Sequence, residues 1–261
     1  MRIIFVRHGE PDYANDTLTP KGWQEARLLS ERIKNWDVDA FYTSPLGRAK
    51  DTASCTLKKM GREAVVLPWM QEFFYPIDDP ITGRHGVPWD FVPSYWTNQP
   101  EMYDSDKWVG SEIMQQNPQI ATAYKEVCQK LDELLSSYGY IRDQHFYRTV
   151  GKEEHFMAGT VAPGNVFTAS KESEGSAGPV IVIFCHLGIT CLALSHLLNI
   201  PFPLLVHGFF MPTSSITVVS SEERWGNEAY FRVQTIGDVH HLLSEGEPVS
   251  IAGSFAKVFQ G

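Results

Sequence analysis

The sequence lacks the features that assign a chain to several common classes of protein. Its four cysteines form no CxxC pair and no zinc-finger spacing: Cys55, Cys128, Cys185 and Cys191. No apolar run approaches the roughly 20 residues that a membrane-spanning helix needs. Basic residues are in the minority, with 22 against 31 acidic ones and a formal net charge of -9. Nucleic acids and anionic membranes favour a basic surface, so we expect neither as a partner.

The expected compartment is the cytoplasm. Arg2 is already charged and the first apolar run is short, so the start of the chain does not resemble a signal peptide. The unpaired cysteines are then expected to be reduced thiols. A chain of 261 residues can bury a core without a disulfide or a metal. The sequence does not decide the oligomeric state, and a homodimer stays open.

Apolar spacing predicts alternating strands and helices in the first 70 residues. Arg2–Val6 is short, apolar and β-branched, which is typical of a buried strand. Thr19 and Pro20 are suited to the start of a helix, and Gly61 to the end of a second one. Two further strands are expected at about 38–44 and 63–68. This β-α-β-α-β order favours a parallel sheet with helices on its faces.

The α/β pattern stops near residue 73 and resumes at Val180. The intervening segment is rich in Pro, Trp, Tyr and Asp and contains one clear helix, from about 117 to 138. A strand, a helix and two later strands follow it. We therefore predict a three-layer α/β/α sandwich with a mostly parallel central sheet. We expect one domain over residues 1–261, with a cap inserted at about 73–178 and a surface loop at 171–179.

Several predicted strands end on polar side chains suited to binding an anion. The first ends on Arg7 and His8, the second is followed by Arg48, and the strand at 180–185 is followed by His186. The carboxyl ends of parallel strands meet at one edge, where ligands of open α/β sheets bind. Arginine side chains and helix N-termini both bind phosphate oxygens. The sequence therefore predicts a phosphate pocket at this edge.

Four motifs in this part of the chain resemble a known family. They are FVRHGEP at the N-terminus, then LTPKGWQEA, TSPLGRAKDTA and finally FCHLG. In this order they are similar to the histidine phosphatase superfamily, which includes the phosphoglycerate mutases. RHG alone is a weak match, but four ordered motifs are specific. They leave the segment from about 73 to 178 uncovered.

The resemblance implies a mechanism without metal or cofactor. His8 matches the nucleophile that forms a phosphohistidine, which water then hydrolyses. Arg7 and Arg48 match the phosphate clamps, and His186 matches the second histidine. The substrate contacts that we expect are Arg7, Gly9, Asn15, Arg48, His186 and Leu187.

The proton donor is harder to identify from the sequence. In the family a carboxylic acid that follows the third strand protonates the leaving group. Glu72 stands at that place and is the first candidate. Asp78 and Asp79 are its rivals, because the motif around them is loose.

The sequence departs from the family at several places, and one of these departures, a missing mutase signature, favours a phosphatase. The acidic composition favours a small phosphorylated metabolite as its substrate. Many members carry an asparagine six residues after the nucleophile, where this chain has Ala14, with Asn15 one further on. The second histidine lies in CHLG, where the family often has SHGG. The signature ENRFTGW of the sugar-phosphate mutases is absent. A phosphomutase and a non-catalytic phospho-ligand binding protein remain the alternatives.

Two other kinds of catalytic site lack support in the sequence. A cysteine at a strand end is typical of protein tyrosine phosphatases, but their loop needs an arginine six residues after Cys185, where this chain has Cys191. Zinc-ligand spacing is not found among the histidines. Aromatic residues of the middle segment are expected mainly in a cap core, with some at the mouth of the pocket: Trp89, Phe91, Tyr95, Trp96, Tyr103 and Trp108.

Overall fold

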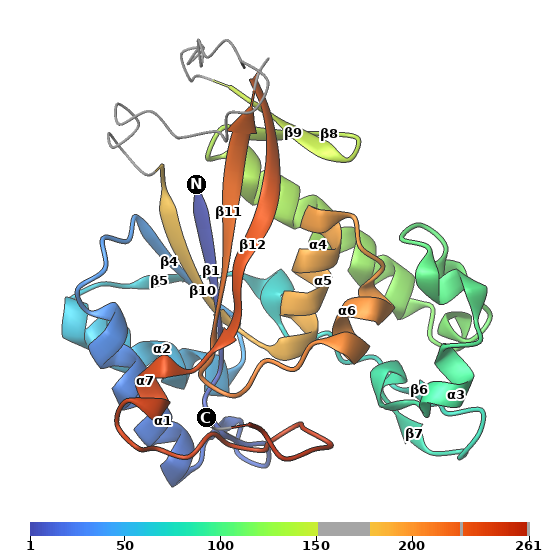
Figure 1. Ribbon diagram of the computed structural model, residues 1–261, viewed down its shortest axis with the longest axis horizontal. Coiled ribbons are helices and arrows are strands. Elements are labelled where there is room, and N and C mark those ends of the chain that lie inside the picture. The colour runs from blue at the N-terminus through green and yellow to red at the C-terminus, as the bar shows by residue number, and fades with distance from the viewer. Residues whose placement is uncertain (151–177, 225–226, 260–261) are drawn as a thin grey trace, which may run out of the picture.

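A large mixed sheet forms the centre of the molecule (Figure 1). The computed structural model describes residues 1–150, 178–224 and 227–259. Within these ranges the main sheet has eight strands. In spatial order they are β5 (Ala64–Val66), β4 (Ala40–Thr43), β10 (Val180–Cys185), β1 (Arg2–Arg7), β11 (Ile216–Arg224), β12 (Glu228–Asp238), β9 (Phe146–Thr149) and β8 (Tyr140–Asp143).

The sheet is parallel in one half and antiparallel in the other. β5, β4, β10 and β1 run parallel, as the alternation of strands and helices predicts. From β1 onward every pairing is antiparallel, because β11 with β12 and β8 with β9 pair as consecutive strands. The sheet is thus more evenly mixed than the mostly parallel one expected. The β8–β9 pair, in particular, was not expected within the middle segment.

Helices cover both faces of the sheet, which confirms the three-layer α/β/α sandwich (Figure 1). Successive residues of β1 point to opposite faces. Ile3 and Phe5 pack in one core cluster, which includes residues of α4 and α5, whereas Ile4 and Val6 pack in another, against α1 and α2. The helices are α1 (Pro20–Ile33), α2 (Gly47–Met60) and α7 (His240–Leu243) on one side, and α4 (Gln119–Ser136), α5 (Leu187–Leu198) and α6 (Phe202–Gly208) on the other.

The helix ends follow the predicted local chemistry. The Thr19 hydroxyl accepts a hydrogen bond from the Gly22 amide at 3.1 Å, and Pro20 is the first residue of α1. Gly61 ends α2 with φ of 63°, in the left-handed region that favours glycine. Both boundaries confirm the prediction.

The middle segment divides into two parts. Residues 68–118 contain short elements: the 3-10 turns η1 (Pro68–Met70), η2 (Pro88–Asp90), η3 (Pro100–Tyr103), η4 (Trp108–Gly110) and η5 (Met114–Gln116), the helix α3 (Pro93–Trp96), and the hairpin of β6 (Ile77–Asp78) and β7 (His85–Gly86). In contrast, α4 packs in a helix layer and β8 and β9 extend the main sheet. The segment that stands apart from the sandwich therefore ends near residue 118, and the predicted loop at 171–177 lies outside the described residues.

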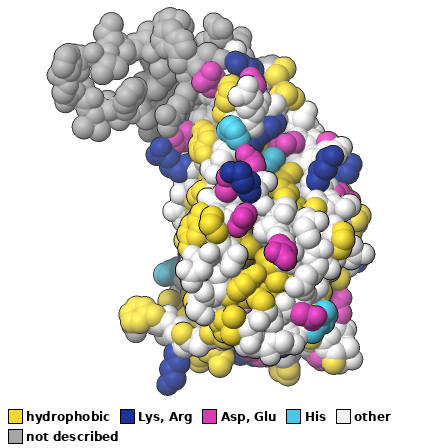
Figure 2. Space-filling view, turned by 90° about the vertical axis from the view of Figure 1, so that its right-hand side faces the viewer, with side chains coloured by type: hydrophobic (Ala, Val, Ile, Leu, Met, Phe, Trp, Pro, Cys, Tyr) yellow, Lys and Arg dark blue, Asp and Glu magenta, His cyan; other side chains and the backbone are white. Residues whose placement is uncertain are grey.

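The face of the molecule on the right-hand side of Figure 1 carries both basic and acidic side chains. Figure 2 shows basic and acidic side chains scattered over this face among hydrophobic ones. In the ranges that the structure describes, no helix has both the length and the apolar character to cross a membrane.

Candidate active site

The parallel register of β1 and β10 brings two histidines together. Arg7 is paired with Cys185, so the residues that follow each strand emerge side by side. The backbone amide of His8 donates to the Cys185 carbonyl at 2.9 Å. The ring centroids of His8 and His186 lie 5.1 Å apart, with an angle of 57° between the rings. The two candidate histidines thus form one site, although 178 positions separate them in the chain (186 minus 8).

A backbone contact selects the tautomer of His8. Its Nδ1 lies 2.7 Å from the carbonyl oxygen of Gly9. A carbonyl only accepts hydrogen bonds, so Nδ1 must carry the proton and Nε2 must hold a lone pair. A Cβ on Gly9 would lie 2.7 Å from the carbonyl oxygen of Gly22, so a larger residue would displace this loop from α1.

Burial keeps the His8 ring neutral. The side chain is 2% exposed, and burial lowers its pKa well below the ordinary value. The positive charges of Arg7 and Arg48 lower the pKa further. At neutral pH the ring is therefore unprotonated at Nε2 and chemically able to act as a nucleophile.

His186 is also buried and keeps one nitrogen without a partner. Its Nε2 lies 2.7 Å from the Ser44 hydroxyl, which also accepts the Leu46 amide. Its Nδ1 has no hydrogen-bond partner among the described residues. Burial is the main cause that lowers the pKa of His186 well below its ordinary value, and electrostatic interactions with His8, Arg48 and Arg7 lower it further. The neutral ring, which follows β10, is thus held by Ser44 at the end of β4, and its Nδ1 is available for a further hydrogen bond.

Each arginine is anchored on one side. Arg7 donates to the carbonyl oxygens of Met211 at 2.6 Å and Ala252 at 3.1 Å. Arg48 donates to the Asp16 carboxylate at 2.6 Å, and the same carboxylate accepts the Gly47 amide. Both guanidinium groups retain a buried Nε with no partner in the described part of the chain. The two guanidinium groups are thus held in place by the protein, and each keeps an N–H group that can donate to an anion.

Glu72 lies on the N-terminus of α5. Its Oε1 accepts the amides of Phe73 at 2.8 Å and Ile189 at 3.0 Å, and its Oε2 lies 3.4 Å from the Gly188 amide. A Cβ on Gly188 would lie 2.7 Å from Oε1, so this glycine makes room for the carboxylate. Oε2 has only the long contact and is the freer oxygen.

The rivals of Glu72 lie elsewhere. Asp78 is exposed and lies 2.8 Å from His85 Nδ1, in the β6–β7 hairpin. The Asp79 carboxylate accepts the amides of Ile81 and Thr82 in the turn of the same hairpin. Asn15 donates its side-chain amide to Asp12 at 2.8 Å in an exposed loop. None of these three lines either cavity described below.

A cavity of about 570 Å³ opens beside the two arginines and His8. Leu187 and Glu72 line it, as does Gly188. The remaining lining residues come mostly from the inserted segment, with one near the start and one near the end of the chain: Tyr13, Phe74, Tyr75, Val87, Trp89, Asp90 and Gly253. A second cavity, of about 280 Å³, adjoins it and shares Gln71, Glu72 and Tyr75. The larger cavity exceeds the volume that a phosphoryl group alone requires, and it leaves room for the organic part of a substrate.

Most of the aromatic wall was not identified from the sequence. Of the middle-segment aromatics singled out there, Trp89 lines the larger cavity, whereas Trp108 is fully buried in the core. Tyr13, Phe74 and Asp90 were missed, because no spacing distinguishes wall residues from others in a segment of short turns. For Tyr13 the available signal was its closeness to the RHG motif.

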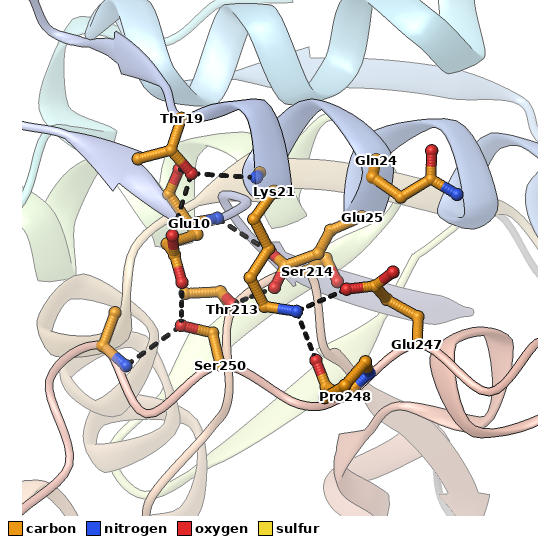
Figure 3. Close-up of polar contacts among 12 residues, drawn as sticks. Glu10, Thr19, Lys21, Gln24, Glu25, Thr213, Ser214, Glu247, Pro248 and Ser250 are labelled. Carbon is orange, nitrogen blue, oxygen red and sulfur yellow. Dashed lines mark hydrogen bonds and ion pairs between the residues drawn. The ribbon is translucent and has the colours of Figure 1, made fainter.

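A buried network supports the loop that carries His8. The Ser214 amide donates to the His8 carbonyl at 3.0 Å. The Glu25 carboxylate accepts the Glu10 amide at 2.8 Å and the Thr213 hydroxyl at 3.0 Å. Figure 3 shows Glu25 between Glu10 and Thr213, with Ser250 of the C-terminal segment donating to Glu10 at 2.6 Å. The loop is thus held by α1, the 211–215 segment and the C-terminal segment together.

Glu25 is a fully buried carboxylate that sequence reasoning missed. Burial raises its pKa from the ordinary 4.5 to about 7. Lys21 lowers the pKa and the charge of Glu10 raises it, both more weakly. A signal was present, because Gly22, Glu25, Ala26 and Leu29 follow the spacing of one helix face.

The cysteine at the end of β10 is not poised for nucleophilic attack. Cys185 is fully buried, and burial raises the pKa of its thiol to about 12. The thiol therefore stays protonated at neutral pH. Across the described residues, no three His, Cys, Asp or Glu side chains gather in a way that could hold a metal ion.

Known proteins share both the motifs and the fold. Residues 3–86 match the model of the histidine phosphatase superfamily (branch 1). A 2,3-bisphosphoglycerate-dependent phosphoglycerate mutase of Thermoplasma acidophilum is 33% identical over 72 residues, which are 24% of this chain and 36% of that protein. The matches span less than half the length of the curated relatives.

Solved structures extend the likeness of the fold across the chain. A mycobacterial glucosyl-3-phosphoglycerate phosphatase has a TM-score of 0.55 at 17% identity, covering 90% of this chain and 98% of that one. A phosphoserine phosphatase mutant from Entamoeba histolytica, in complex with phosphoserine, has a TM-score of 0.53 at 17% identity, covering 92% and 98%. Residues 3–86, which carry the matched motifs, are thus similar to the histidine phosphatase superfamily, and the chain as a whole shares the fold of these phosphatases.

Proposed function

We propose that this protein is a metal-independent phosphomonoester hydrolase that works through a phosphohistidine on His8. The observation that carries the proposal is the state of His8. Its ring is buried and neutral, its Nδ1 proton is held by the Gly9 carbonyl, and its Nε2 lone pair is free. Arg7 and Arg48 beside it are suited to a phosphoryl group.

In the first step Nε2 of His8 attacks phosphorus and forms a P–N bond as the ester P–O bond breaks. Glu72 in its acid form gives a proton to the leaving oxygen, so an alcohol departs. In the second step water attacks phosphorus, the P–N bond breaks, and the Glu72 carboxylate takes the proton of the water. Arg7, Arg48 and His186 stabilise the charge of the phosphoryl oxygens in both steps.

We assign substrate selection to residues 73–118, as a cap on a single α/β domain. This segment contributes Phe74, Tyr75, Val87, Trp89 and Asp90 to the cavity wall. A cavity of about 570 Å³ suits a small phosphorylated metabolite. Two relatives by fold are named for the hydrolysis of such compounds, phosphoserine and glucosyl-3-phosphoglycerate.

A phosphomutase is the second candidate, supported by the curated relative named as a phosphoglycerate mutase. It differs only in the acceptor, because the phosphohistidine would return its phosphoryl group to an alcohol instead of water. A non-catalytic phospho-ligand binding protein would keep the arginines without turning over.

The test is release of inorganic phosphate from 4-nitrophenyl phosphate, with a metal chelator present. The wild type is expected to turn over, and His8→Ala is expected to be inactive while it keeps its circular dichroism spectrum. Equal activity in both proteins would contradict the His8 mechanism. Turnover that appears only with an added alcohol acceptor would favour the mutase. Phosphate binding without turnover would favour the binding protein.

A further inference from the structure

Asp90 differs from the other carboxylate of the larger cavity. Glu72 accepts the amide of Phe73 and two amides at the start of α5, so its oxygens already have protein partners. Asp90 ends the turn η2, and its side chain has no hydrogen-bond or ion-pair partner among the residues that the structure describes. Among the described residues, the charged group that acts on it noticeably is Arg84, which is exposed and does not line the cavity.

The cavity therefore combines charged groups of both signs with aromatic side chains. Arg7, His8 and Arg48 supply positive charge and hydrogen-bond donors, and Asp90 supplies a negative charge on the inserted segment. Aromatic side chains complete the wall: Tyr13, Phe74, Tyr75 and Trp89. Asp90 and Trp89 line the same cavity, and a carboxylate and an indole can both bind an ammonium group, through a charge-assisted hydrogen bond and contact with an aromatic face.

We propose that Asp90 selects phosphomonoesters whose organic part carries a protonated amine. The arginines bind the phosphoryl group, the aromatic wall contacts the carbon skeleton, and the Asp90 carboxylate accepts hydrogen bonds from the ammonium group. This inference rests on the proposed function, because it assumes that the phosphoryl group binds beside His8. It adds the chemical class of the substrate and a residue that selects it.

The experiment compares matched aryl phosphates. One series carries an aminoalkyl chain of one to three carbons in the para position. The other carries the isosteric alkyl chain, in which a methyl group replaces the ammonium group. The readout is the ratio of kcat/KM for the amine to kcat/KM for its isostere. For the best chain length the wild type is expected to prefer the amine by about tenfold, which is typical of one charge-assisted hydrogen bond.

Asp90→Asn tests the assignment, and Asp106→Asn is its matched control. Asp106 is an exposed aspartate of the same inserted segment and lines neither cavity. Asp90→Asn is expected to lower the ratio to near one, whereas Asp106→Asn is expected to keep the wild-type ratio. An unchanged ratio in Asp90→Asn, or no preference for any amine in the wild type, would overturn the proposal.

Binding of the corresponding aryl phosphonates separates this inference from the proposed function, because phosphonates cannot be hydrolysed. Calorimetry is expected to show the same preference for the amine in wild type and its loss in Asp90→Asn. Amine-selective binding without any turnover of the phosphates would reject the hydrolase and keep the role of Asp90. Turnover without amine preference in either assay would reject the role of Asp90 and keep the hydrolase.

Discussion

The sandwich and the inserted segment position their side chains in different ways. In the sandwich, polar residues follow parallel strands and emerge at one edge because the strands share a register. In residues 73–118 the side chains are positioned by short turns that pack on one another and on α6. Motifs therefore identify the site residues of the sandwich from the sequence. In residues 73–118, the residues that line the cavity are identified only from the folded structure. We therefore propose that the sandwich performs the chemistry and that the inserted segment selects the substrate.

The largest effect is expected when the proton donor is changed. Glu72→Gln should lower hydrolysis of alkyl phosphates by about 10³-fold, because an amide cannot protonate a poor leaving group. It should affect 4-nitrophenyl phosphate far less, since that leaving group departs as an anion. The measurement is kcat/KM against the pKa of the leaving group. Asp78→Asn, in the β6–β7 hairpin, should keep the wild-type slope, and a steeper slope there would return the role to Asp78.

The next effect concerns the buried carboxylate under the His8 loop. Folding raises the pKa of Glu25 to about 7, so the folded state holds a proton that the unfolded chain releases above about pH 4.5. Stability is therefore expected to fall by about 3 kcal/mol as the pH rises from 4.5 to 7. Glu25→Gln should remove this part of the slope, measured by urea unfolding across that range. The exposed Glu63→Gln serves as the control, and an unchanged slope in Glu25→Gln would contradict the assignment.

A smaller effect is expected at the anchor of Arg48. Asp16→Asn weakens the ion pair that orients the guanidinium group and leaves the arginine itself in place. We expect about a tenfold loss in kcat/KM, with the larger share in KM for the phosphorylated substrate. Steady-state kinetics check this expectation. Asp12→Asn, in the same loop but bonded to Asn15, provides the comparison.

The smallest effect is expected in the inserted segment. Trp89→Ala removes an aromatic wall, so KM for aryl phosphates should rise about threefold to tenfold. Turnover of a small alkyl phosphate should change less, because its phosphoryl group contacts the sandwich. The ratio of the two substrates is the readout, with Tyr103→Ala, exposed and outside the cavity, as the control. An equal loss for both substrates would remove the division between chemistry and selectivity.

The sequence predicted those features that depend on residues close together in the chain. The end of β1 at Arg7, the start of α1 at Thr19 and the end of α2 at Gly61 follow from short-range chemistry, and the structure confirms them. The placement of Glu72 at the start of α5 joins residues 72 and 189, which no local pattern connects. The antiparallel half of the sheet also escaped prediction, because β8 and β9 are short strands next to a segment without periodicity.

The sequence by itself determined which groups lie at the carboxyl edge of the sheet. The order of strands and helices predicts the direction of the parallel strands, and the sequence gives the residue that follows each of them. The tertiary structure alone decided the protonation states and the neighbours of these groups. The lowered pKa of His8 and the raised pKa of Glu25 arise from burial, to which segments distant in sequence contribute. The cavity likewise exists only because residues 73–118 fold against that edge. Solvation and proximity depend on the whole fold, and so does the chemistry built on them.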